Sequence, residues 1–168
     1  MITYIIMGIS LLLDGILSNF LPYMINDLSY FYPMFTLMSI ILIYPFYKKE
    51  PKKYLLTIFI LGIIYDLFYT NLLIFDGLIF VLIGLVVKII YQNMPTNFFT
   101  IILYALLGII IYEVLTSLVF IAFQLVPINY KDIIYKISHS LILNIIYIEI
   151  MFLIIKILPK KYTSNKIN

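Results

Sequence analysis

The sequence has few of the residue types that build catalytic and metal sites in soluble proteins. Its 168 residues include no cysteine, no arginine, no tryptophan and one histidine. Without cysteine the chain forms neither a disulfide framework nor a thiolate metal site, and one histidine excludes a histidine-rich metal site. Charged residues make up 11% of the chain, and the net charge of +3 comes from lysines placed mainly beside apolar segments. This pattern indicates membrane topology and not a nucleic-acid partner.

Apolar residues dominate what remains. They make up 64% of the chain, against about 45–50% in soluble domains, and the mean hydropathy is +1.12. Because a membrane-spanning helix needs about 20 residues, the chain has room for about six spans and little else. We therefore expect an all-α membrane protein, in which one membrane domain, residues 1–168, forms a single compact bundle. The six predicted spans cover residues 2–20, 30–47, 53–69, 71–91, 97–124 and 133–158.

The lysines predict the orientation of these spans. Short loops on the cytoplasmic side of a membrane carry an excess of lysine. Nine lysines fall on one predicted side, and only Lys131 and Lys136 fall on the other. We therefore expect a multi-pass protein of the plasma membrane with both termini in the cytoplasm.

Four acidic residues lie well inside the predicted spans: Asp14, Asp66, Glu113 and Glu149. A charged acid at the centre of a span costs about 2.5–3.5 kcal/mol, so each must be paired, protonated or turned toward the bundle interior. One interpretation is that they only form hydrogen bonds between helices. The other, which we favour for Asp66, is a specific recognition or fold-defining role.

Small and polar residues mark the helix faces that should meet protein. Ser10, Asp14 and Ser18 recur every four residues and predict a polar stripe on the first span. In the third span, Gly62 precedes Asp66 by one turn, so a neighbouring helix could approach closely and meet the acid. Further candidates for helix packing or partner binding are Gly77 and Gly84 in the fourth span and Asn144 in the sixth.

The segment 61–84, L-G-I-I-Y-D-L-F-Y-T-N-L-L-I-F-D-G-L-I-F-V-L-I-G, resembles the characteristic region of the MreD family of bacterial rod shape-determining membrane proteins. In that family a glycine lies four residues before an aspartate, a short turn follows, and a second glycine opens the next helix. Gly62, Asp66 and Gly77 match this pattern, with a predicted turn at residues 69–71, and Glu113 agrees as well. Asp76 departs from it, because a small or apolar residue is more usual before the second glycine.

The resemblance implies a non-enzymatic scaffold or regulator of the cell-elongation machinery, which directs cell shape and lateral peptidoglycan synthesis. The implied partners are MreC, MreB, RodA and a class B penicillin-binding protein, besides the lipid bilayer, and no cofactor is implied. The family also resembles, in its six-helix fold, the substrate-binding S component of energy-coupling-factor vitamin transporters.

Two other functions remain open from the sequence. In an S component, Asp14, Asp66, Glu113 and His139 would form a polar cluster that opens outward and lines a vitamin pocket. In an ion or proton carrier, the same acids would act as a relay. No motif of a hydrolase, a metalloprotease or a nucleotide-binding enzyme is present.

Overall fold

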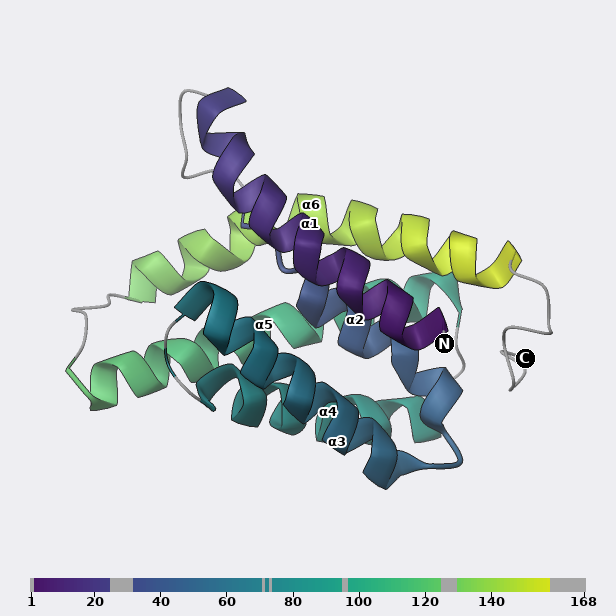
Figure 1. The fold of residues 1–168 in the computed structure, drawn as a ribbon. Coiled ribbons are helices and arrows are strands. Elements are labelled where there is room, and N and C mark those ends of the chain that lie inside the picture. The colour runs from purple at the N-terminus through teal and green to yellow at the C-terminus, as the bar shows by residue number, and fades with distance from the viewer. Residues whose placement is uncertain are drawn as a thin grey trace.

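The computed structural model describes residues 2–24, 32–70, 72, 74–94, 97–124 and 130–157, and these residues form helices without any strand. Figure 1 shows how the helices lie against one another in a bundle. In chain order they are α1 (Ile2–Met24), α2 (Phe35–Ile43), the 3-10 helix η2 (Tyr44–Tyr47), α3 (Pro51–Tyr65), the π-helical turn η3 (Asp66–Thr70), α4 (Phe75–Asn93), α5 (Phe98–Ala122) and α6 (Tyr130–Ile157).

Five of these helices are long and apolar enough to cross a membrane, namely α1, α3 together with η3, α4, α5 and α6. The chain is therefore a multi-pass, all-helical membrane protein, as the composition predicts. The second predicted span, residues 30–47, is shorter than expected, because Tyr32, Pro33 and Met34 are not helical and α2 begins only at Phe35.

The short helix α2 occupies the centre of the bundle. All of its residues are buried, and it packs against α1, α4, α5 and α6. A helix that is apolar on every side is stable only when it is surrounded. From their rises per residue, α2 and η2 together span about 21 Å, which is less than the roughly 30 Å of hydrocarbon. Because Lys48 and Lys49 directly follow η2, we expect the start of α2 at membrane depth, where its free N–H groups need partners.

Tyrosine side chains satisfy the other end of α2. The hydroxyls of Tyr54 and Tyr91 donate hydrogen bonds to the carbonyl oxygens of Ile40 and Ile41 at 3.1 and 3.2 Å. The residue four positions after Ile41 is Pro45, which has no N–H to donate. The tyrosines thus join α3 and α4 to the end of the central helix.

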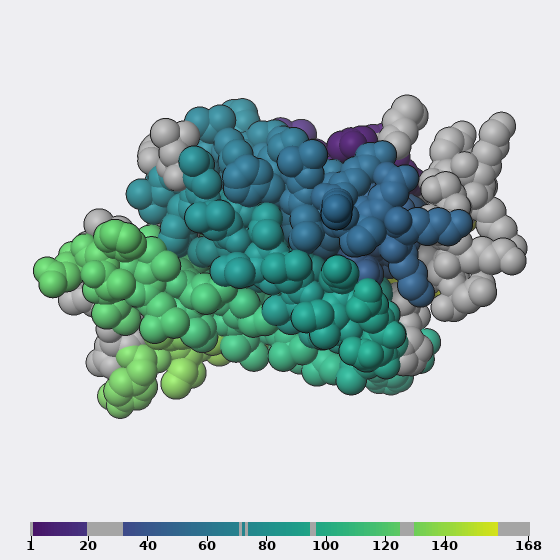
Figure 2. Space-filling view, turned by 90° about the horizontal axis from the view of Figure 1, so that it is seen from below, coloured from purple at the N-terminus to yellow at the C-terminus, as the bar shows by residue number. Residues whose placement is uncertain are grey.

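Outside this core, leucine, isoleucine and phenylalanine side chains cover the bundle. The face made by α3, α4 and α5 is shown in Figure 2. Exposed apolar side chains on α4 and α5 include Leu78, Leu82 and Leu103, each between 40% and 58% exposed. An apolar surface of this extent is suited to lipid or to other membrane helices.

The start of α1, the connection from η2 to α3 and the end of α6 lie at the same end of the bundle (Figure 1). At the opposite end, the chain differs from the expected turn at residues 69–71. The helix continues through Thr70 as the π-helical turn η3, and α4 begins at Phe75. Asn71 lies outside the described residues.

Candidate functional site

Asp14 on α1 binds the start of the central helix. The backbone N–H groups of Phe35 and Thr36, the first two residues of α2, donate hydrogen bonds to Asp14 Oδ1 and Oδ2 at 2.6 and 2.8 Å. Met34 precedes the helix, and its side chain provides no cap. A carboxylate at this position satisfies free N–H groups and interacts favourably with the helix dipole. Asp14 is thus an N-terminal cap supplied by another helix.

Asn144 on α6 completes the same helix start. Its Oδ1 accepts a hydrogen bond from the N–H of Met34 at 2.7 Å, and its Nδ2 donates to the carbonyl oxygen of Tyr32 at 2.9 Å. The Nδ2 group also donates to the carbonyl oxygen of Ser140 at 2.7 Å, within α6 itself. Asp14 and Asn144 therefore fix α1, α2 and α6 to one another through the backbone of residues 32–36.

Asp66 performs the corresponding role at the start of α4. The N–H of Asp76 lies 3.1 Å from Asp66 Oδ1 and 3.0 Å from Oδ2, and the N–H of Gly77 lies 3.4 Å from Oδ2. The hydroxyl of Thr70 donates a further hydrogen bond to Oδ1 at 2.8 Å. Asp66 is fully buried. Its carboxylate is thus held by donors from η3 and the start of α4.

Gly62 makes this arrangement possible, because it brings α3 against the start of α4. A Cβ atom added to Gly62 would touch the Cα of Gly77 and would lie 2.6 Å from its backbone nitrogen and 2.8 Å from the carbonyl carbon of Asp76. Only glycine fits against backbone at such a distance. Gly62, Asp66 and Gly77 therefore form one unit, in which the glycines set the approach of the helices and the acid caps the second helix.

Gly84 lies farther along the same seam between α3 and α4. There an added Cβ would meet side chains, the terminal methyl of Ile58 and, at 3.1 Å, the ring of Tyr54. The close approach at Gly84 thus involves groups that can rotate, whereas the approach at Gly62 involves backbone.

Asp76, at the first turn of α4, is a second fully buried carboxylate beside Asp66. Its Oδ1 accepts a hydrogen bond from the hydroxyl of Tyr112 on α5 at 2.9 Å. Its Oδ2 is buried and has no hydrogen-bond partner among the described residues. The sequence noted Asp76 only as a departure from the family pattern and did not predict this link from α4 to α5.

The other polar residues that the sequence singled out do not cluster around Gly62, Asp66 and Gly77. Ser10 is buried and lies 2.6 Å from the hydroxyl of Tyr147 on α6, whereas Ser18, predicted to face protein, is exposed. Glu113 on α5 is buried at 5% exposure, and Glu149 on α6 is partly exposed. His139 lies 2.7 Å from the carbonyl oxygen of Tyr135 on its own helix.

The space beside the acids is small. A cavity of about 10 Å³ lies between Asp14, Tyr65 and Tyr112, and neither Glu113 nor His139 lines it. This volume is close to the minimum for one water molecule. Among the residues that the structure describes, no group of three or more His, Asp or Glu side chains is arranged to hold a metal ion. The geometry of these acids is therefore that of helix capping, since their described partners are backbone N–H groups and hydroxyls.

The sequence did not predict which groups the acids and Asn144 bind, because those groups lie far away along the chain. Asp14 binds residues 21 and 22 positions away, Asn144 binds residues 110 and 112 positions away, and Tyr112 lies 36 positions from Asp76. One signal was available, because Asp76 and Gly77 fall where the next helix begins, and N–H groups at a helix start attract carboxylates.

Comparison with known proteins places the chain in one family. No curated protein and no solved structure matches the chain. A family model described as rod shape-determining protein MreD matches residues 1–162, which is nearly the whole chain. The chain therefore belongs to the MreD family and has a role in rod shape determination.

Proposed function

We propose that this protein is a non-enzymatic scaffold of the bacterial cell-elongation machinery, which binds MreC and the wall-synthesis enzymes within the membrane. Membership of the MreD family supports the role in cell shape. The observation that carries the scaffold proposal is that Asp14 and Asp66 are both used inside the bundle, as caps of α2 and α4. Their hydrogen bonds hold the helices in a fixed arrangement and are not directed to a substrate.

A rigid bundle with an apolar exterior is suited to recruit other membrane proteins. Helix association in lipid depends on shape and close packing, because lipid is as apolar as the helices. Exposed leucine and isoleucine side chains on α3, α4 and α5 are available for such packing. The outer faces of these helices, or the end of the bundle that carries Lys48, Lys49, Lys52 and Lys53, would contact the proposed partners. Those partners are MreC, MreB, RodA and the class B penicillin-binding protein.

The S component of a vitamin transporter is the alternative function. It needs an enclosed pocket of about 300–1,000 Å³ for a small molecule. The cavity that Asp14, Tyr65 and Tyr112 line has about 10 Å³, far below this range. This observation favours the scaffold.

The test is a pull-down of the tagged chain from its native cells in mild detergent, with mass spectrometry of the proteins and small molecules that are recovered. We expect MreC and the wall-synthesis pair. Recovery of paired ATPases with a tightly held vitamin would contradict the scaffold proposal.

A separate experiment tests the proposed orientation, with both termini in the cytoplasm. A reporter fused after Asn168 should be active only in the cytoplasm, and activity outside would contradict this orientation.

A further inference from the structure

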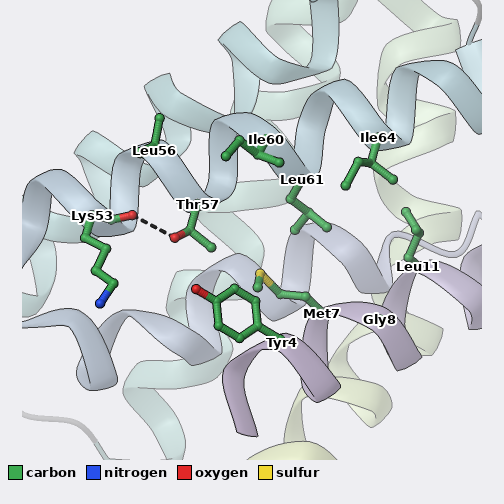
Figure 3. A pocket seen from close by; sticks show the side chains of 10 residues that line it. All are labelled: Tyr4, Met7, Gly8, Leu11, Lys53, Leu56, Thr57, Ile60, Leu61 and Ile64. Carbon is green, nitrogen blue, oxygen red and sulfur yellow. Dashed lines mark hydrogen bonds between the residues drawn. The ribbon is translucent and has the colours of Figure 1, made fainter. Parts of the chain in front are cut away.

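A second feature lies away from the capping acids, on the outer side of the bundle. A groove of about 380 Å³ runs between α1 and α3. Figure 3 shows Met7, Gly8 and Leu11 on one wall and Leu56, Ile60 and Ile64 on the other. Because α1 packs mainly on α2, the space between α1 and α3 is left unfilled.

The dimensions of the groove suit a hydrocarbon chain. Along α3 it extends from Lys53 to Ile64, which is about 16 Å at the helical rise. Its walls are almost entirely apolar side chains. Carbon atoms pack about 4 Å apart, so an extended acyl chain can lie along α3 in contact with both walls.

Gly8 lies in the wall of the groove and keeps it open. A Cβ atom added to Gly8 would meet nothing within 4 Å, although Gly15 on the same helix is covered by the ring of Tyr69. Glycine lowers helix stability by about 1 kcal/mol relative to alanine. Its presence at an uncrowded position is explained if the space above it is filled by something other than the residues that the structure describes.

One end of the groove is positively charged. Lys53 lies at this end, is 59% exposed, and forms an ion pair with Glu50 at 3.2 Å. Lys48, Lys49 and Lys52 are exposed in the same connection, so four lysines accompany one acid. Tyr4 places its ring and hydroxyl beside Lys53 and Thr57 (Figure 3). A phosphate would find donors and positive charge here, at the point where the apolar groove begins.

We propose that this groove binds one acyl chain of an anionic phospholipid, with the phosphate of the lipid at Lys53. The apolar walls select a hydrocarbon chain, and the lysines select a negative head group over a zwitterionic one. The proposal rests on the groove and its charges and is independent of the proposed partners.

The absence of tryptophan from the chain allows a direct test. Ile60→Trp places a single fluorophore in the groove, and Leu103→Trp places one on α5, which has no lysine; these side chains are 49% and 40% exposed. Each variant is reconstituted in vesicles that contain brominated phosphatidylglycerol or brominated phosphatidylcholine, and quenching by the two lipids is compared. If Ile60→Trp does not yield folded protein, Leu56→Trp reports on the same groove.

We expect phosphatidylglycerol to bind about fivefold better than phosphatidylcholine near Ile60→Trp, a ratio that corresponds to about 1 kcal/mol for one lysine near an anionic group. The ratio of phosphatidylglycerol binding to phosphatidylcholine binding should be about one near Leu103→Trp. It should also fall to about one near Ile60→Trp when Lys53→Gln is added to that variant. Gly8→Phe should reduce quenching of Ile60→Trp by both lipids, whereas Ile9→Phe, on a lipid-facing position of the same helix, should not.

Equal quenching by both lipids at Ile60→Trp would overturn the proposal. The absence of quenching by either lipid would overturn it too, because that result is expected for a groove filled by a protein segment.

Discussion

The carboxylate of Asp66, at the end of α3, accepts the backbone N–H of Asp76, at the start of α4, at 3.0 and 3.1 Å. The two residues are ten positions apart, and the short connection between them leaves the start of α4 without a capping side chain of its own. The residue before α4 is Ile74, which adopts a left-handed conformation with φ of 73°. Such a conformation is costly for a β-branched residue. Asp66 therefore stabilises a helix start that its own local sequence does not favour.

The same arrangement occurs at the start of α2, where Asp14 and Asn144 supply the acceptors. In water a free N–H group at a helix start would bind solvent, but in a bilayer it has no such partner. Two helices of this bundle thus begin where side chains from other helices satisfy their N–H groups. These hydrogen bonds explain how the acids are stabilised inside membrane spans.

The glycines on α1, α3 and α4 should differ in their tolerance of alanine. Gly62→Ala should lower the free energy of unfolding by about 1–3 kcal/mol, as for overpacked cores, because its methyl group meets the backbone of Gly77. Gly84→Ala should cost less, because the groups that it meets, on Ile58 and Tyr54, are side-chain atoms that can move. Gly8→Ala should be neutral or stabilising by up to about 1 kcal/mol. Unfolding in mixed micelles gives the ranking, and a larger cost for Gly84→Ala than for Gly62→Ala would contradict it.

Asp14 and Asn144 should act together on the start of α2. Each alanine variant should lose about 0.5–2 kcal/mol of stability, as for other helix caps. Because both side chains hold the backbone of residues 32–36, the losses should not add, and a double-mutant cycle should give a coupling of about 0.5–3 kcal/mol. Additive losses would show that the two caps act independently. A suitable control pair is Asp14→Ala with Gly84→Ala, which should be additive.

The hydroxyl of Tyr112 should stabilise the bundle only through its hydrogen bond to Asp76. Tyr112→Phe removes the hydroxyl that donates to Asp76 Oδ1 and leaves a buried carboxylate without this hydrogen bond. The expected cost is about 1–3 kcal/mol. In an Asp76→Ala background the same substitution should cost less than about 0.5 kcal/mol, because the acceptor is gone. Equal costs in the two backgrounds would mean that the hydroxyl of Tyr112 stabilises the bundle through a group other than Asp76.

The sequence predicted the helical membrane fold because composition and segment length determine it. It placed α1, α3, α4, α5 and α6 to within a few residues, and it singled out Asp14, Asp66 and Asn144 because polar groups are costly in a span. The late start of α2 at Phe35 was not predictable, since Asp14 and Asn144 supply its caps from distant parts of the chain. Tyr69 and Thr70, which were expected in a turn, instead end η3, where Thr70 donates a hydrogen bond to Asp66.

The pairing of Asp76 with Tyr112 and the exposure of Ser18 were also beyond the sequence. A period of four residues places Ser10, Asp14 and Ser18 on one face, but it does not say how far along α1 the neighbouring helices extend. Ser10 and Asp14 meet α6 and α2, whereas Ser18 lies beyond them and is exposed.

Amide hydrogen exchange at Asp76 and Gly77, compared between the wild-type chain and Asp66→Ala, tests the capping role of Asp66 most directly. A lost cap costs about 1–2 kcal/mol, so these two amides should exchange about 5–30 times faster, while amides in the middle of α5 remain unchanged. Asp66→Asn, which keeps one acceptor oxygen, should show a smaller increase. The contradicting result has two parts: exchange at Asp76 and Gly77 is unchanged in Asp66→Ala, and cells that depend on this variant lose their rod shape. That result would assign Asp66 to direct contact with a partner.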